Sequence, residues 1–271
     1  MFGGYSRYRF FGINQQWARG YGLLPPRMRQ SIRETLASTH LLSSSLRRKL
    51  QHTFIGRGND LESLYLDNFY AAFSRQDQSR ILAARPGSTY QSYRSYWDAR
   101  SSSDWLDRLL YADMKTYLVE LLMKQDQMSM ACSIESRVPF LDHPFVEFAM
   151  RIPEHMKIHR GCGKYVLKRA VEDLLPHDII YRKKMGFPTP LRQWLLNPRS
   201  DDLFSILRAR EGLLAEYVDR AQLDALLIRH RNGFEDATDR IWRLLNLQIW
   251  GDLFLTGREN AWRDGLMAAA S

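Results

Sequence analysis

Cysteine is scarce in this sequence. Cys132 and Cys162 are the two cysteines among 271 residues, and they form no CxxC pair. Small secreted domains are usually rich in disulfides, and structural zinc sites usually need closely spaced cysteines, so the sequence predicts a reducing compartment and no metal site. No run approaches the ~18 apolar residues that cross a bilayer, and Arg7 and Arg9 interrupt the segment where a signal peptide is apolar. We therefore expect a cytoplasmic protein with no membrane partner.

Acidic residues are also few relative to basic ones. Aspartate and glutamate total 30 against 39 lysines and arginines, which leaves a formal net charge of +9. A surplus of this kind can reflect polyanion binding, or an acidic partner surface that lies outside this sequence. The arginines are scattered through every segment and form no block, which argues against a nucleic-acid partner.

Strand-like alternation and internal repeats are both missing, whereas helical periodicity is frequent. The strongest expected helix runs over 104–124, where apolar residues recur at spacings of three and four. Asp142 is placed to cap a short helix that ends near Met150. Further helices are expected over 27–38, after Ser43, after Asn59 or Asp60, after Gly163, and over 201–214, 219–230 and 237–255. The fold class expected from these patterns is mainly α.

The stretch 123–142 mixes ionisable groups with residues that are typical of a protein interior. Charges in an apolar setting are costly unless they are paired or used, because their desolvation is expensive. Glu135 and Arg137 could form a buried ion pair that stabilises the fold, or could position a phosphate. Asp142 could act with them or serve only as a helix cap.

Lys164 is the sharpest single candidate for chemistry. It follows Gly161-Cys162-Gly163 and is expected in the first turn of a helix, where a positive charge suits a phosphate. The alternative is an ordinary solvated lysine, since the glycines do not form a GxxxxGK[ST] loop. Two other segments could also approach a ligand: the adjacent Gly3 and Gly4, and the basic loop Arg182-Lys183-Lys184, which could equally be a solvated loop.

Four segments in order resemble the synthetase domain of the glutamine-dependent asparagine synthetases. They are FGGYSRYRFF (2–11), MSMACSIESRVPFLDHPFVEFA (128–149), GKYVLKRA (163–170) and RKKMGFPTPLRQWL (182–195). This resemblance implies that residues 1–257 are the C-terminal helical part of an α/β adenine-nucleotide-hydrolase-like (PP-loop ATP pyrophosphatase) synthetase domain. Residues 258–271 are expected to form a frayed tail.

The resemblance also implies a reaction. Such enzymes use Mg²⁺ and ATP to adenylate the side-chain carboxylate of aspartate, and ammonia from glutamine then forms asparagine with release of AMP and pyrophosphate. By position, Lys164 matches a lysine that neutralises phosphate or acyl-adenylate charge, and Glu135 and Arg137 are further catalytic candidates. Five residues are implied near ATP and pyrophosphate: Gly3, Gly4, Asp142, Lys183 and Lys184.

The sequence departs from this family in what it omits. It contains no Ser-Gly-Gly-x-Asp-Ser pyrophosphate loop and no N-terminal cysteine nucleophile of a glutaminase. We therefore expect a fragment that begins inside the family's Gly-Gly-Asp-Glu loop, with ATP and Mg²⁺ held mainly by upstream residues and with little activity alone. The expected partners are the missing glutaminase and ATP-loop portions, and a second copy in a full-length homodimer.

Two alternatives remain beside aspartate amidation. A relative of this family could amidate or cyclise another carboxylate. The chain could also be a non-catalytic helical module that binds a separately encoded ATP-binding half.

Overall fold

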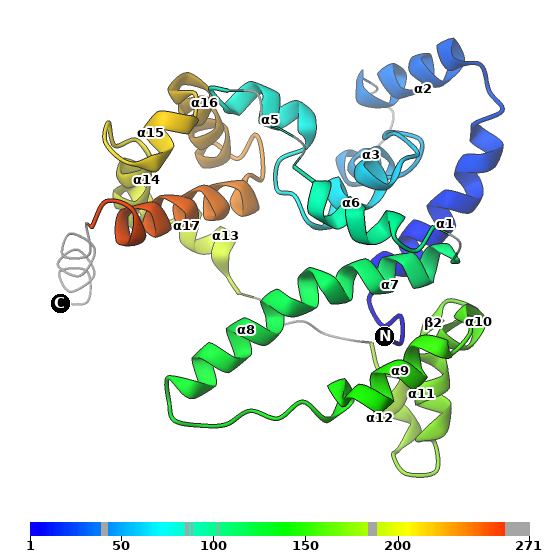
Figure 1. Ribbon diagram of the computed structural model, residues 1–271. Helices are drawn as coiled ribbons and strands as arrows, with labels where there is room; N and C mark the ends of the chain where they lie inside the picture. The colour runs from blue at the N-terminus through cyan, green and yellow to red at the C-terminus, as the bar shows by residue number, and fades with distance from the viewer. Residues whose placement is uncertain (39–42, 85–86, 88, 102, 184–188, 258–271) are drawn as a thin grey trace. The chain divides into compact units, whose positions relative to one another are not determined.

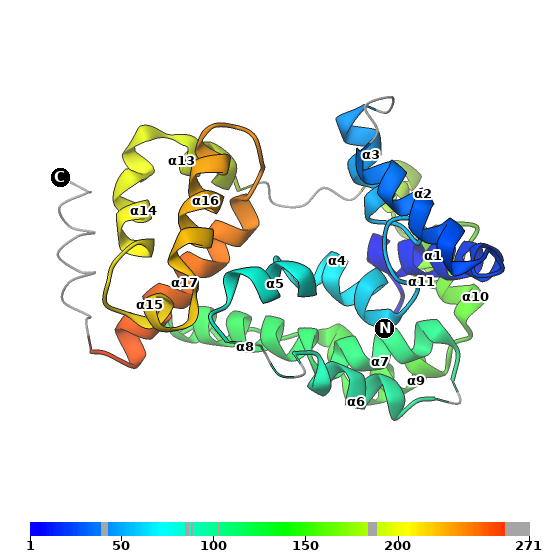
Figure 2. The same ribbon diagram turned by 90° about the horizontal axis from the view of Figure 1, so that it is seen from above.

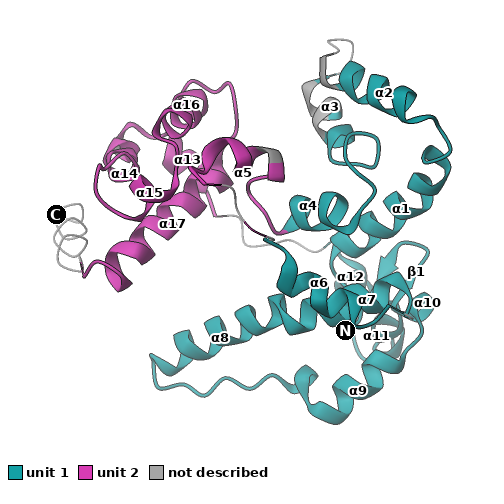
Figure 3. Ribbon diagram, turned by 45° about the horizontal axis from the view of Figure 1, so that its top comes forward, with its two compact units in different colours: residues 1–69, 88–184 teal, residues 70–87, 185–271 magenta. Residues whose placement is uncertain are grey.

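The structure is a computed structural model that describes residues 1–38, 43–84, 87, 89–101, 103–183 and 189–257. These residues are mainly helical, which confirms the expected helical character of the chain (Figure 1). They fall into two compact units, unit 1 with residues 1–69 and 88–184, and unit 2 with residues 70–87 and 185–271 (Figure 3). None of the described helices is long and apolar enough to cross a membrane.

Unit 1 contains the N-terminal and central helices. Its elements are α1 (Ser6–Tyr21), α2 (Pro26–Ser38), α3 (Ser44–Gln51), the π-helical turn η1 (Glu62–Leu66), α4 (Asp67–Phe69), α6 (Gln91–Asp98), α7 (Trp105–Lys115), α8 (Tyr117–Met130), the 3-10 turn η2 (Pro139–Leu141), α9 (His143–Arg151), α10 (Glu154–Lys157), β1 (Ile158–His159), β2 (Cys162–Gly163), α11 (Tyr165–Ala170) and α12 (His177–Tyr181).

Helix α1 crosses α7 at a glycine. A Cβ atom on Gly12 would lie 2.7 Å from the ring of Trp105, so only glycine permits this approach. Phe11, on the same face of α1, packs edge-on to Tyr65 with ring centroids 5.6 Å apart. Two of the aromatic residues near the N-terminus, for which no helix was predicted, are thus part of the core of unit 1: Tyr8 and Phe11.

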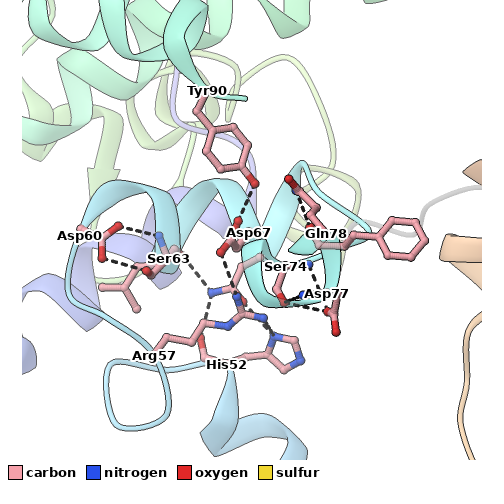
Figure 4. Close-up of polar contacts among 12 residues, drawn as sticks. His52, Arg57, Asp60, Ser63, Asp67, Ser74, Asp77, Gln78 and Tyr90 are labelled. Atoms are coloured by element: carbon pink, nitrogen blue, oxygen red, sulfur yellow. Dashed lines mark hydrogen bonds and ion pairs between the residues drawn. The ribbon is translucent and has the colours of Figure 1, made fainter. Parts of the chain in front are cut away.

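Two predicted helix starts are confirmed by their caps in unit 1. The side chain of Ser43 accepts a hydrogen bond from the backbone N–H of Leu46 at 3.3 Å. Asp60 accepts one from the N–H of Ser63 at 2.9 Å, which opens the turn that leads into α4 (Figure 4). Figure 4 also shows Asp67, which accepts a hydrogen bond from the hydroxyl of Tyr90.

Other predictions for unit 1 were wrong in detail. The helix expected over 104–124 is broken at Thr116, whose backbone departs from helical angles, and α8 then continues to Met130. A short antiparallel hairpin, β1 with β2, was not predicted, because two residues are too few to show alternation. The turn of this hairpin is made by Arg160 and Gly161, both with positive φ.

Unit 2 is a bundle of short helices around α17. Its elements are α5 (Arg75–Ile81), α13 (Leu191–Leu196), the 3-10 turn η3 (Pro198–Ser200), α14 (Asp201–Leu207), α15 (Leu213–Tyr217), α16 (Arg220–Arg231) and α17 (Thr238–Phe254). Helix α17 lies against α14 and α15, as Figure 2 shows from above. The helices predicted over 219–230 and 237–255 are confirmed within two residues. The helix predicted over 201–214 ends early, at Leu207.

The core of unit 2 joins both of its chain segments. Residue Ile81 of α5 is buried together with Leu195, Phe204, Leu227 and Ile241. The backbone on either side of Leu82 pairs with the segment around Val218, which attaches the first segment of unit 2 to the second. The predicted frayed tail, 258–271, lies outside the described residues.

Candidate functional site

The glycine loop at the N-terminus packs directly against the loop that carries Lys164. The backbone N–H of Lys164 donates a hydrogen bond to the carbonyl of Phe2 at 3.0 Å. A Cβ atom on Gly163 would lie 2.6 Å from the carbonyl oxygen of Gly3, and one on Gly4 would lie 2.4 Å from Cε of Lys164. A side chain at Gly163 would therefore push the two loops apart, whereas one at Gly4 would displace the Lys164 side chain.

The backbone of Lys164 is itself unusual. Its φ of 56° and ψ of 31° place a non-glycine residue in the left-handed region, which costs of order 1–3 kcal/mol and is found preferentially at functional sites. The sequence predicts Lys164 in the first turn of a helix, but Lys164 is instead the N-cap residue that precedes α11. The helix has six residues, so the case for an anion site rests on the lysine side chain.

The β1–β2 hairpin holds this lysine in place relative to α1. The guanidinium of Arg9, on α1, donates a hydrogen bond to the carbonyl of Gly161 at 3.2 Å. Gly163 ends strand β2, and Lys164 follows at once. The hairpin, the N-terminal loop and α1 therefore form one connected support for the Lys164 side chain.

A pocket of 290 Å³ opens at this junction. Its lining combines the glycine loop with Lys164 and apolar or aromatic groups: Met1, Phe2, Gly3, Gly4, Tyr5, Tyr8, Phe140, Lys164 and Leu167. Lys164 is the one charged side chain in this lining, so the pocket suits a group that carries negative charge. The Gly3, Gly4 and Lys164 candidates are thus brought together.

None of the other candidates that the structure describes lines this pocket. Glu135 and Arg137 pair with each other at 2.7 Å, with side chains 69% and 81% exposed. Asp142 holds the N-cap position of α9, but its side chain makes no capping hydrogen bond. Lys183 is exposed, and Lys184 lies outside the described residues. Their roles stay predictions.

The stretch 123–142 is not interior in this structure, which corrects the sequence reading. Its apolar side chains are largely exposed, with Met128 at 68% and Ile134 at 60%. Helix α8, which carries the first part of the stretch, buries none of its residues. The expectation rested on the apolar residue types of this stretch, and the described residues of unit 1 do not cover them.

Sequence reasoning missed a buried carboxylate below the pocket. Asp113 of α7 accepts hydrogen bonds from Arg7 at 2.7 Å and from the hydroxyls of Tyr8, Tyr65 and Tyr93 at 2.6, 3.0 and 2.8 Å. One signal could have revealed it: Asp113 lies among the apolar residues of the helix stripe, where an unpaired charge would be costly.

This cluster controls the ionisation of its tyrosines. Burial is the main reason why the pKa of Tyr8 and of Tyr65 is raised far above 10.0, and the negative charge of Asp113 adds to the effect. Both hydroxyls are therefore held as neutral donors. Tyr8 also lines the Lys164 pocket, so the Asp113 cluster positions part of the pocket wall.

The fold and the pocket describe a mainly helical protein in which a lysine side chain lies beside a glycine loop. The positive charge of this lysine can neutralise a carboxylate or a phosphate. The comparisons with known proteins narrow this description. The asparagine synthase family profile matches residues 1–252, so the chain belongs to the asparagine synthase family. This confirms the resemblance that the four motifs indicated.

The similar curated proteins are considerably longer than this chain. It is 28% identical to asparagine synthetase [glutamine-hydrolyzing] 1 of Bacillus subtilis, over 95% of this chain but 39% of that protein. It is 32% identical to a putative asparagine synthetase [glutamine-hydrolyzing] of Mycobacterium tuberculosis, over 94% of this chain and 38% of that protein. The chain thus spans about two-fifths of the length of these relatives. No solved structure matches it.

Proposed function

We propose that this chain supplies the lysine-bearing helical part of an ATP-dependent amide ligase of the asparagine synthetase type. The observation that carries the proposal is the packing of Lys164 against Gly4 in a pocket where Lys164 is the one charged side chain of the lining. Family membership supports the same conclusion. The PP-loop synthetase fold, with residues 1–257 as its C-terminal part, belongs to this proposal.

In the proposed reaction, a carboxylate oxygen of aspartate attacks the α-phosphorus of ATP, and the bond to pyrophosphate breaks. Ammonia then attacks the acyl carbon of the resulting acyl-adenylate, loses a proton, and AMP leaves with the electrons of the broken C–O bond. Negative charge builds up on phosphate oxygens in the first step. The ammonium of Lys164 would neutralise that charge, and an electrostatic contribution of this kind is often the largest in catalysis.

Of the two ligands that the family implies, ATP and Mg²⁺, the lining of the pocket fits the phosphates of ATP but not Mg²⁺. A phosphate or carboxylate suits the Lys164 ammonium, and the absence of side chains at Gly3 and Gly4 lets a ligand approach the backbone. Mg²⁺ prefers carboxylate and carbonyl oxygens, but no carboxylate lines this pocket, and the described residues contain no cluster of three or more metal-ligating side chains. These residues do not fit a magnesium site, and any Mg²⁺ ligands would come from another part of the enzyme.

We infer that the chain needs a complementary polypeptide part for activity. Its sequence contains no Ser-Gly-Gly-x-Asp-Ser loop, and the relatives are more than twice as long as the matched region. The exposed apolar side chains of α8 and of the segment after it, such as Met128 and Ile134, support this inference, because such faces are normally covered. Glutamine as the ammonia source, a full-length homodimer and a cytoplasmic location remain part of the proposal.

Aspartate-dependent exchange between ATP and pyrophosphate tests the proposal. The chain alone should show no exchange. A chimera that carries this chain in place of the matching region of the Bacillus subtilis relative should restore it. In that chimera, Lys164→Ala should lower exchange by at least about 100-fold, the scale of a lost charge-stabilising donor. Lys49→Ala, an exposed lysine of α3, is the matched control and should leave the rate unchanged.

Two results would contradict parts of this proposal. Strong exchange by the isolated chain would remove the need for a complementary part. An active chimera that tolerates Lys164→Ala would return this lysine to the role of a solvated surface residue. If the chimera is active with other carboxylates and inactive with aspartate, the alternative of a different acceptor substrate is the correct one.

A further inference from the structure

A second and larger pocket lies in unit 1, and it shares no lining residue with the Lys164 pocket. Its volume of 680 Å³ lies within the range of about 300–1,000 Å³ that is typical of small-molecule sites. Its walls come from α7, α9 and α10 and the segments beside them, and we call it the α7–α9–α10 pocket. Four apolar side chains form part of its lining: Leu106, Met114, Val146 and Met150. The pocket therefore has room for a small molecule with an apolar portion.

Lys157 gives this pocket a buried positive charge. The residue is 2% exposed, and its Nζ donates to the carbonyl of Met150 at 3.2 Å, which satisfies one of the last carbonyls of α9. An ammonium has three donors, and this is its single hydrogen bond within the described residues. Two N–H groups of a buried lysine thus remain for an acceptor in the pocket.

Two carboxylates on the same pocket, those of Asp104 and Glu154, form no hydrogen bond or ion pair within the described part of the chain. Asp104 holds the N-cap position of α7 without making the cap hydrogen bond, and Glu154 begins α10. Four other charged residues line this pocket: Arg100, Asp107, Glu147 and Arg151. Arg100 pairs with Asp107 at 3.1 Å and Glu147 lies 3.7 Å from His143, while Arg151 is an exposed residue of the rim.

The pKa shifts of Glu154 and Lys157 indicate that each of these two side chains would gain from a ligand group of opposite charge. Burial is the main cause that raises the pKa of Glu154, and the charge of Asp104 raises it further. Burial also lowers the pKa of Lys157, although Asp107 and Glu154 act in the opposite direction. A ligand cation near the two carboxylates and a ligand anion near the lysine would offset both desolvation costs.

We propose that the α7–α9–α10 pocket binds a free α-amino acid with an apolar side chain, its carboxylate on Lys157 and its ammonium beside Asp104 and Glu154. A simple anion would meet two carboxylates, and a simple cation would meet the buried lysine, so a ligand that carries both charges fits best. The apolar lining then receives the side chain. This site goes beyond the proposed ligase function, because it neither uses Lys164 nor requires ATP.

Calorimetric titration of the whole chain with L-leucine and L-methionine tests the proposal. We expect one binding site per chain, with a Kd on the order of 1 mM or tighter. N-acetyl-L-leucine lacks the ammonium and L-leucinamide lacks the carboxylate, and each should bind at least about tenfold more weakly. Equal binding of all three leucine compounds, or no binding of any of them, would overturn the proposal.

Substitutions separate this site from any other binding. Asp104→Asn and Lys157→Met should each weaken leucine binding at least about tenfold, whereas Glu120→Gln and Lys49→Met, at exposed positions outside the pocket, should not. Lys157→Met also removes a contact with the end of α9, so Asp104→Asn, an exposed side chain with no partner in the described structure, is the variant that tests charge alone. Leucine binding that survives Asp104→Asn unchanged would refute the assigned orientation. Loss of ligase activity in the chimera would have no bearing on these results.

Discussion

Replacement of Asp113 by asparagine should destabilise unit 1 severely. The substitution keeps the shape of the side chain but removes the negative charge that four donors share. Arg7, whose side chain is 10% exposed, would lose its buried ionic partner, and a change of this kind typically costs about 3–5 kcal/mol. A domain is usually stable by only about 5–15 kcal/mol, so the variant should lose a large fraction of its stability.

Three tyrosine variants divide the expected loss of stability among the individual hydrogen bonds to Asp113. Tyr8→Phe, Tyr65→Phe and Tyr93→Phe each remove one hydrogen bond to a charged acceptor and should each cost about 1.5–3 kcal/mol. In the Asp113→Asn background each of them should cost less, because donors of one network are not additive.

The measurement is urea unfolding monitored by hydrogen exchange of the α7 amides. These amides report on unit 1 alone, which is needed because the two units need not unfold together. Asp126→Asn, an exposed carboxylate on α8, is the control and should stay within about 0.5 kcal/mol of the parent chain. If Asp113→Asn also changes stability by less than about 1 kcal/mol, the reasoning that this carboxylate organises unit 1 fails.

Because of the same tyrosines, we expect the stability of unit 1 to fall at alkaline pH. The pKa values of Tyr8 and Tyr65 are raised in the folded chain above 10.0, so the unfolded chain loses these protons first as the pH rises. The stability that the neutral tyrosines contribute is therefore complete below pH 10 and declines above it. Unfolding free energies measured between about pH 8 and pH 11 should show the decline, and it should be smaller in Tyr65→Phe. An identical pH profile in both chains would contradict the assignment.

Two further predictions concern other sites. His230 in unit 2 accepts a hydrogen bond from the N–H of Ala237 at 3.2 Å, and burial lowers its pKa. Stability of unit 2 should be complete above the ordinary pKa of 6.5 and fall below it, as tested by unfolding from pH 8 to pH 5, and His230→Gln should flatten that profile. Gly163→Ala should destabilise unit 1 by about 1–3 kcal/mol, because its Cβ would collide with the carbonyl of Gly3. Gly20→Ala, at an open position of α1, should stabilise the chain by about 0.5–1 kcal/mol, and equal effects of the two glycine variants in thermal unfolding would refute the close approach.

Prediction from the sequence succeeded where the signal was local. The helix starts at Ser43 and Asp60 were predicted because an N-cap side chain bonds to a residue two or three positions later. Asp142 was predicted as a cap for the same reason and holds the N-cap position of α9, but its side chain makes no capping hydrogen bond. The break at Thr116 was not predicted, because the apolar residues on both sides continue the same helical spacing. A single distorted residue leaves the hydrophobic pattern unchanged.

For the candidate site, the sequence identified the residues and the structure selected among them. Gly3, Gly4 and Lys164 were singled out for different reasons, and the structure places them in one pocket. Glu135 and Arg137 were expected to share an interior with other charged groups, yet they form an exposed pair. Their exposure follows from what lies beside them in space, which spacing along the chain does not report.

The sequence alone determined the helical character of this protein and its family, because helical periodicity and short motifs are properties of neighbouring residues. Only the tertiary structure decided that Gly4 meets Lys164 and that Asp113 gathers Arg7 with three tyrosines. Asp113 and Arg7 are 106 positions apart, so no local pattern couples them. Such pairs form because burial of one charge requires a partner of opposite charge at the same place in the fold, wherever that partner lies in the chain.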